Sequence, residues 1–219
     1  MNTTLLTCAI LAATAFLPLA CHSPSNQEAA GCESCAGCAD CEGEDWQTLW
    51  DGESMAGWSM CGPGEFLIED GALKATGGMG MLWYSDASFR DFTLRLQWKV
   101  EHETDNSGVF VRFPDPGDDP WIAVNQGYEL QICDEAPEKH NTGSIYSFQG
   151  STSMPTRAIG EWNDYEISVI DQHYTIKVNG QLVNEFDGER SREGYFGMQN
   201  HDDGSPVRFR NIRIQRRES

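Results

Sequence analysis

The residues best suited to chemistry lie in a short segment near the middle of the chain. Residues 128–133 read Tyr-Glu-Leu-Gln-Ile-Cys, so apolar and polar side chains alternate. Successive side chains of a β-strand point to opposite faces, so this pattern predicts a strand with Glu129 and Gln131 on one face. In an ordinary half-buried strand that face would meet water. With the carboxylate of Asp134 just beyond, it could instead form the floor of a polar groove, and two carboxylates are also what a glycosidase uses.

Two further polar residues could join Glu129. Arg112 stands in an otherwise apolar run, 109–113, that could pair with the strand of Glu129, and an Arg–carboxylate contact there could be functional or a structural salt bridge. His201 ends another expected strand and precedes two Asp residues. An imidazole beside carboxylates can be a general acid, a general base or a metal ligand, although such a residue is often only part of a surface loop.

Trp83 and Trp121 are aromatic residues that could complete such a groove. A Trp ring can stack on a sugar ring, but a single aromatic residue packs in a core or a loop just as readily. The sequence has no nucleophile elbow, zinc-protease helix motif, phosphate loop or dinucleotide fingerprint. The polar groups on the expected strands therefore remain the candidates.

The segments that would position these side chains read as short strands. The clearest is 92–100, where apolar and polar residues alternate throughout. Asp70-Gly71 and Asn179-Gly180 suit tight turns, so each predicts a hairpin. The last strand, 207–214, changes the phase of its apolar residues, which predicts a β-bulge near Arg210-Asn211.

These elements predict an all-β fold. No segment shows helical periodicity, and residues 114–126, with three prolines, are expected to form a long loop. About a dozen short strands with Gly-rich turns are typical of an antiparallel two-sheet sandwich or jelly roll, here a single domain over residues 46–216.

Composition narrows the class of partner. Hydrophobic residues make up 39% of the chain, with seven Trp and ten Phe, which is enough for a real core. The formal net charge of -19 argues against nucleic acid as a partner, because phosphate binding needs clustered Lys and Arg. It argues equally against peripheral binding to anionic lipid.

The first 45 residues have a different character. Residues 1–20 are mostly apolar and resemble a secretory signal peptide, and Cys21 follows a sequence similar to the bacterial lipoprotein cleavage box. The apolar run is shorter than the roughly 20 residues of a membrane-spanning helix. We therefore expect an exported protein of the periplasm or cell envelope, with Cys21 lipidated and anchored to the membrane; an ordinary cleaved signal is the alternative.

Residues 21–45 are expected to form a tether with a Cys-rich linker. Cysteines recur there at every third position, as Cys32, Cys35, Cys38 and Cys41. Such repeats can bind zinc or an iron–sulfur cluster. Local disulfides, or a linker without chemistry, fit an exported segment of small and acidic residues better.

Ten short motifs occur in order between Trp46 and Ile214. They are WQTLWDGESMAGW, FLIEDGALKA, DFTLRLQWKV, NSGVFVR, GYELQICD, TGSIY, WNDYEISV, VNGQLV, GYFGMQNH and VRFRNIRI. Together they closely resemble the bacterial 3-keto-disaccharide hydrolase domain. The resemblance implies a concanavalin-like jelly roll, export, and action on glycosides in which one sugar has been oxidised to a 3-ketone. The long acidic loop before GYELQ departs from the pattern and is expected to influence substrate choice.

The implied reaction needs three kinds of group. A 3-ketone acidifies the proton on C2, so a base can form an enolate that expels the C1 substituent, and water can add afterwards. On this resemblance Glu129 is the expected base or a metal ligand, and Arg112 or a divalent metal ion polarises the ketone. His201 or Asp134 would then serve the leaving group. A further set is expected to bind sugar hydroxyls: Gln131, Asn106 and Tyr146.

Two other functions fit the same sequence. A non-catalytic carbohydrate-binding module or surface lectin would use the same fold to bind sugars without turnover. A structural envelope lipoprotein would neither bind nor cleave them.

Overall fold

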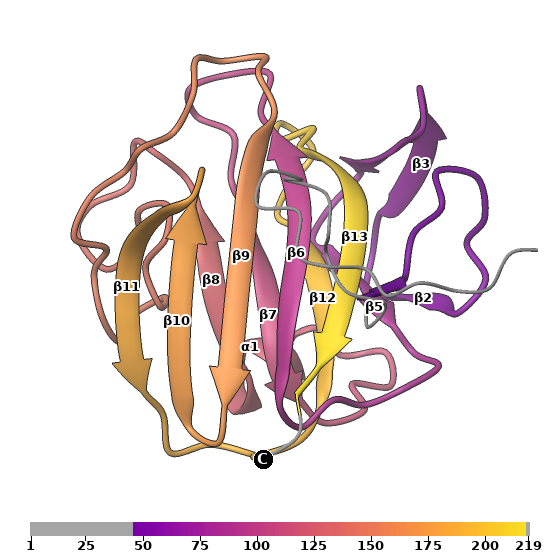
Figure 1. Ribbon diagram of the computed structural model, residues 1–219. Coiled ribbons are helices and arrows are strands. Elements are labelled where there is room, and N and C mark those ends of the chain that lie inside the picture. The colour runs from indigo at the N-terminus through magenta and orange to yellow at the C-terminus, as the bar shows by residue number, and fades with distance from the viewer. Residues whose placement is uncertain (1–45, 218–219) are drawn as a thin grey trace, which may run out of the picture. The chain divides into compact units, whose positions relative to one another are not determined.

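Two antiparallel sheets make up the folded part of the chain. The computed structural model describes residues 46–217, and Figure 1 shows one sheet in front of the other. The strands are β1 (Trp46–Thr48), β2 (Trp58–Cys61), β3 (Glu65–Glu69), β4 (Ala72–Thr76), β5 (Gly80–Tyr84), β6 (Phe92–Lys99), β7 (Ser107–Phe113), β8 (Tyr128–Ile132), β9 (Asn163–Ile170), β10 (His173–Val178), β11 (Gln181–Asp187), β12 (Tyr195–Asn200) and β13 (Arg208–Arg216). The expected all-β sandwich is therefore confirmed.

The strand order places the candidate residues in the smaller sheet. The larger sheet runs β11-β10-β9-β6-β13-β4-β3, with β1 paired to β13, and the smaller one runs β2-β5-β12-β7-β8. Thus β8, which carries Glu129, pairs with β7 as expected, but it lies at the edge of the smaller sheet. Strand β12, which leads to His201, pairs with the other side of β7.

The core fills the space between the two sheets. Leu94 and Trp98 of β6 and Leu130 and Ile132 of β8 belong to one cluster of buried apolar side chains. Full burial of such a side chain contributes about 1.5–3 kcal/mol. Because alternate residues of β8 face this core, Glu129 and Gln131 must project from the opposite, outer face of the smaller sheet.

Turn chemistry holds the strands in register as predicted. Asp70 and Gly71 both have positive φ between β3 and β4, and so do Asn179 and Gly180 between β10 and β11. The expected bulge in β13 is also present, because its register against β6 shifts between Arg210 and Arg213.

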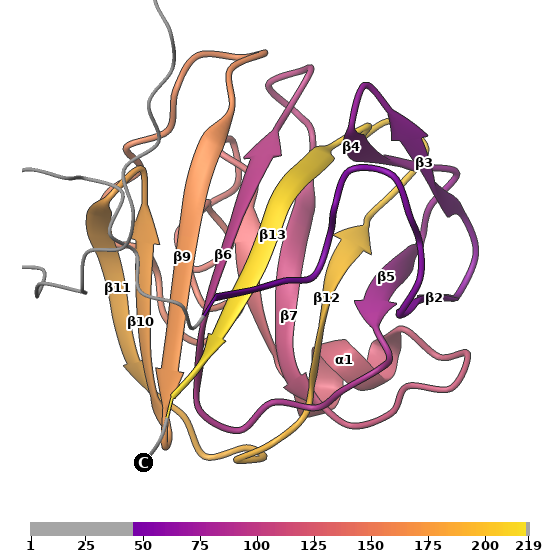
Figure 2. The ribbon, with the colours of Figure 1, turned by 45° about the vertical axis from the view of Figure 1, so that its right-hand side comes forward.

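The expectation that residues 114–126 form only a loop is wrong. They contain a short helix, α1 (Trp121–Gln126), which follows Pro120 and ends at Gly127. Six residues are fewer than two helical turns, so the sequence shows no helical period there. Helix α1 packs against β7 and β8 with Ala123 buried, at the lower end of the smaller sheet in Figure 2. It therefore stands beside the outer face that carries Glu129.

Three predictions lie outside the described residues because they concern residues 1–45. They are the signal peptide, the lipidation of Cys21 and the chemistry of the linker cysteines. Within residues 46–217, no helix is both long and apolar enough to cross a membrane.

Candidate functional site

A pocket opens on the outer face of the smaller sheet. It encloses ≈ 570 Å³ including the space open to solvent, which suits a small ligand. Its lining comes from β5, β7, β8, β12, α1 and the loops beside them: Met79, Gly80, Asn106, Phe110, Pro120, Trp121, Val124, Glu129, Gln131, Tyr146, Gln199 and His201.

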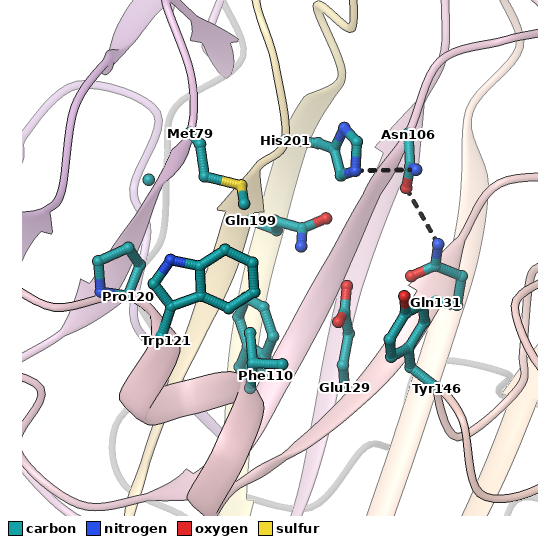
Figure 3. Close-up of a pocket in the computed structure, with 12 residues that line it drawn as sticks. Met79, Asn106, Phe110, Pro120, Trp121, Glu129, Gln131, Tyr146, Gln199 and His201 are labelled. Carbon is teal, nitrogen blue, oxygen red and sulfur yellow. Dashed lines mark hydrogen bonds between the residues drawn. The ribbon is translucent and has the colours of Figure 1, made fainter.

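The pocket has one apolar and one polar side (Figure 3). Met79, Pro120 and Trp121 stand on one side, and Asn106, Gln131 and Tyr146 on the other. The side chain of Glu129 points into the space between them. A pyranose ring presents apolar C–H faces and polar hydroxyl edges, so this division suits a sugar, with Trp121 available for stacking.

The carboxyl group of Glu129 lies in a dry environment. Only 6% of the residue is exposed. Burial raises the pKa of Glu129 from 4.5 to about 8, and a hydrogen bond from Gln199 offsets part of that effect. A carboxylate with a high pKa is a stronger base than an ordinary one once it ionises, so Glu129 is suited to proton transfer near neutral pH.

Gly108 of β7 makes room for this side chain. A Cβ at position 108 would lie 2.5 Å from Glu129 Oε1 and 2.8 Å from Glu129 Cγ. The narrow space explains why a glycine occupies the second position of a fully buried strand.

Gly108→Ala should therefore displace the Glu129 carboxyl group. We expect kcat/KM for the substrate proposed below to fall by about 10²-fold, the effect of a misplacement near 1 Å. Gly150→Ala is the control, since its Cβ would meet only the side chain of Glu138 and the nearby backbone at 3.0 Å or more. Steady-state kinetics and thermal unfolding of both variants check this, and unchanged kinetics of Gly108→Ala would contradict it.

A chain of hydrogen bonds leads from β8 to His201. Gln131 Nε2 donates to Asn106 Oδ1 at 3.0 Å, and Asn106 Nδ2 lies 3.1 Å from His201 Nε2. On the far side of the ring, His201 Nδ1 lies 2.6 Å from Asp202 Oδ2. Figure 3 shows the first two of these contacts.

Most of the predicted site residues meet in this pocket. Glu129, His201, Gln131, Asn106, Tyr146 and Trp121 all line it. Tyr146 reaches it because the loop after β8 folds back along that strand, with Tyr146 N donating to Glu129 O at 2.9 Å.

Arg112 does not reach the pocket, and the expected contact with Glu129 is absent. Its guanidinium donates to Arg90 O and Asp171 O and pairs with Asp91 Oδ1 at 3.1 Å. The cause is a β-bulge: the register between β7 and β12 skips position 112, where φ is +55°. The bulge turns Arg112 away from the pocket face, and its contacts fit the structural salt bridge that the sequence left open.

Asp134 and Trp83 also lie outside this pocket. Asp134 accepts hydrogen bonds from Thr142 Oγ1 at 2.5 Å and Thr156 Oγ1 at 2.6 Å, and it lines a separate cavity. It lies beyond the end of β8, where strict alternation no longer applies. Trp83 is buried against Tyr195, with ring centroids 4.8 Å apart, and serves packing.

Sequence reasoning missed Gln199 and much of the apolar side. Gln199 lies on β12 and is 7% exposed, and its Oε1 is buried without a hydrogen-bond partner. The alternation of β12 could have revealed it, because Phe196 and Met198 face the core and leave Gln199 on the outer face. Met79 and Pro120 come from irregular segments and Val124 from the short helix α1, none of which gives such a signal.

Among residues 46–217, no three His, Cys, Asp or Glu side chains converge as a metal site would require. The described donors therefore do not fit the divalent ion that the sequence left open, and no step below is assigned to one.

Comparison with known proteins identifies the family of the fold. A family model described as the 3-keto-alpha-glucoside-1,2-lyase-like domain matches residues 45–215. A 3-keto-disaccharide hydrolase from Bacteroides thetaiotaomicron is 26% identical in an alignment 227 positions long, and the alignment covers 77% of this chain and 77% of that one.

Solved structures give the same architecture. A candidate glycosyl hydrolase from Parabacteroides distasonis superposes with a TM-score of 0.70 at 19% identity, covering 80% of this chain and 95% of that one. A carbohydrate-binding module from Bacillus subtilis superposes with a TM-score of 0.56 at 15% identity, covering 73% and 95%. At these identities the likeness concerns the fold.

Proposed function

Because the chain belongs to the 3-keto-alpha-glucoside-1,2-lyase-like domain family, we propose that it cleaves 3-keto-glycosides in the pocket around Glu129. Elimination breaks the C1–O bond, and addition of water to the resulting enone completes a net hydrolysis. The observation that carries this proposal is the buried carboxyl group of Glu129, facing a sugar-sized pocket that also holds an imidazole.

Glu129 is the base of the first step. Its carboxylate takes the proton from C2 of the oxidised sugar, and the electron pair passes to the ketone as an enolate. When water has added to C1, the carboxyl group returns a proton to C2. A high pKa favours both transfers, because the pKa of the carboxyl group is then closer to the pKa of the C2 proton, which is a weak carbon acid.

The enolate oxygen needs hydrogen-bond donors in place of Arg112. Gln199 and Tyr146 line the pocket beside Glu129 and carry an amide N–H and a phenolic O–H. We assign them this role because preorganised donors in a water-poor site stabilise developing charge most effectively. Asn106 and Gln131 then bind sugar hydroxyls, and Trp121 stacks on the ring.

His201 serves the leaving group. As the imidazolium it gives a proton to the departing oxygen at C1, and as the neutral ring it takes a proton from the water that adds to C1. The two transfers restore its starting state, so the cycle consumes only water.

The decisive experiment offers the purified protein a 3-keto-glucoside and the same glucoside without the ketone. Release of the aglycone from the first and not from the second supports the proposal, whereas no release from either would overturn it. Parallel reactions after exhaustive chelation show whether turnover depends on a metal ion.

The pH dependence should report Glu129 directly. A 4-nitrophenyl 3-keto-glucoside needs no acid for its leaving group, so its elimination depends on the ionised carboxylate alone. We expect kcat/KM for this substrate to rise with pH up to about pH 8, where Glu129 ionises, and then to level off. A profile that falls above pH 8 would show that Glu129 acts as an acid.

A second function rests on the likeness to a carbohydrate-binding module. A module of this fold would bind sugars in the same pocket without cleaving them. Calorimetric binding of unoxidised glycans with no release from 3-keto-glucosides would favour it.

A further inference from the structure

We propose that Asp202 is a positioning residue that keeps a proton on Nδ1 of His201, so that Nε2 is the nitrogen that exchanges protons in the pocket. The arrangement of the ring follows from the structure alone. The exchange with the leaving group rests on the function proposed above.

The direction of the hydrogen bonds follows from Gln131. Its Nε2 can only donate, so the contact at 3.0 Å identifies the facing atom of Asn106 as Oδ1. The Nδ2 of Asn106 therefore faces His201 Nε2, at 3.1 Å. Because Nδ2 is a donor, Nε2 of the neutral ring must accept, and the ring proton resides on Nδ1.

Asp202 stabilises the same arrangement from the other side. Its Oδ2 lies 2.6 Å from His201 Nδ1 and accepts that proton. The carboxylate is itself held in place, because Gly204 N donates to Oδ1 at 2.7 Å and Ser205 Oγ donates to Oδ2 at 3.3 Å. Burial alone would raise the pKa of Asp202, but the hydrogen bonds from His201, Gly204 and Ser205 outweigh it and lower the pKa.

Ser205 contacts both residues that hold the His201 ring, Asp202 and Asn106. Its Oγ accepts a hydrogen bond from Asn106 N at 3.0 Å, so the turn that orients Asp202 also fixes the start of β7. The two contacts of the imidazole thus come from one connected piece of structure. A ring held at both nitrogens keeps its plane and returns to the same tautomer each time it becomes neutral.

The hydrogen bonds around His201 predict that substitutions of Asp202 and of Asn106 change the position of the ring proton in different ways. Asp202→Asn replaces the charged acceptor of Nδ1–H with an amide that can offer either N–H or oxygen. Asn106→Asp places a carboxylate opposite Nε2 and should draw the proton to that nitrogen. Asp203→Asn is the matched control, since Asp203 is an exposed neighbour that carries the same charge.

The test reads the tautomer directly in the absence of substrate. In ¹⁵N–¹H spectra of the full chain labelled at histidine, recorded above pH 8, His201 should show a protonated Nδ1 and a bare Nε2 in the wild type and in Asp203→Asn. Asp202→Asn should weaken this pattern, and Asn106→Asp should reverse it. The His201→Gln variant identifies the resonances. A wild-type ring protonated on Nε2, or a pattern unchanged in Asp202→Asn, would overturn the proposal.

Kinetics with two leaving groups distinguish a role of Asp202 in proton transfer from a purely structural role, because a structural defect would slow both substrates equally. With a sugar leaving group, Asp202→Asn should lose about 10- to 100-fold in kcat with little change in KM. With the 4-nitrophenyl leaving group, which departs without a proton, the rate of 4-nitrophenol release in a single turnover should stay within about threefold of the wild-type rate, because that step comes before water addition. Equal losses on both substrates would overturn the assignment of Asp202 to the leaving-group proton. If the wild type cleaves neither substrate, the proposed function fails, while the spectra still decide the tautomer.

Discussion

Glu129→Gln should lower turnover of a 3-keto-glucoside by about 10²- to 10⁴-fold, the usual contribution of a general base. The amide keeps the size of the side chain but cannot take a proton from C2. Because Gln lacks only the ionisable oxygen, the pocket should still bind the substrate, and the loss should appear mainly in kcat. Turnover within a fewfold of the wild type would remove Glu129 from the mechanism.

The same variant has a stability signature that shows whether it is folded. The folded protein holds the Glu129 proton up to about pH 8, whereas the unfolded chain releases it near 4.5. This group therefore makes the wild type less stable as pH rises between those values, by about 5 kcal/mol in all. Glu129→Gln lacks the effect, so its stability relative to the wild type should increase with pH. Urea unfolding of both proteins at pH 5 and pH 9 measures the difference, and a difference that stays constant would contradict the burial of a neutral carboxyl group.

Alternation along strands accounts for what the sequence could predict of this site. Glu129 and Gln131 share a face of β8 because the strand is regular, and this face could be identified from six consecutive residues. The sequence could not decide whether the face meets water or forms the floor of a pocket. That depends on α1 and on the loop carrying Tyr146, which pack beside the strand and whose placement cannot be inferred from the alternation within it.

The expected contact between Arg112 and Glu129 is absent because the alternation is broken at position 112. One extra residue in β7 changes the side to which every following side chain points, and nothing in the run Val-Phe-Val-Arg-Phe indicates it. The bulge in β13 was predictable because its apolar residues visibly change phase, whereas Arg112 is a buried charge that resembles a polar residue on the outer face. A buried ion pair of this kind can be recognised only when its partner is known, and here the partner is Asp91, with the backbone carbonyls of Arg90 and Asp171 as further acceptors.

Arg112→Met should destabilise the fold by about 3–5 kcal/mol, because it leaves the buried carboxylate of Asp91 without its partner. Arg112 also donates hydrogen bonds to the backbone carbonyls of Arg90 and Asp171. Its loss therefore removes the hydrogen bond between β7 and the β9–β10 turn. Methionine is unbranched and similar in length, and it adds no β-branch at a residue with positive φ. The cost should therefore reflect the lost pairing. Arg157→Met, which breaks an exposed pair with Asp164, should cost about 1 kcal/mol or less.

The effect of Arg112→Met on turnover decides between a structural and a catalytic role. The residue lies outside the pocket, so protein that remains folded at low temperature should keep kcat within about threefold, far less than the 10²-fold or more expected for a lost catalytic group. Urea unfolding gives the stability, and kinetics at a temperature below the transition give kcat. Arg112→Lys, which keeps the charge with fewer donors, should unfold between the wild type and Arg112→Met. If Arg112→Met were as stable as the wild type but inactive, the guanidinium would belong to the reaction after all. Such a result would mean that the strand must rearrange around position 112 when substrate binds.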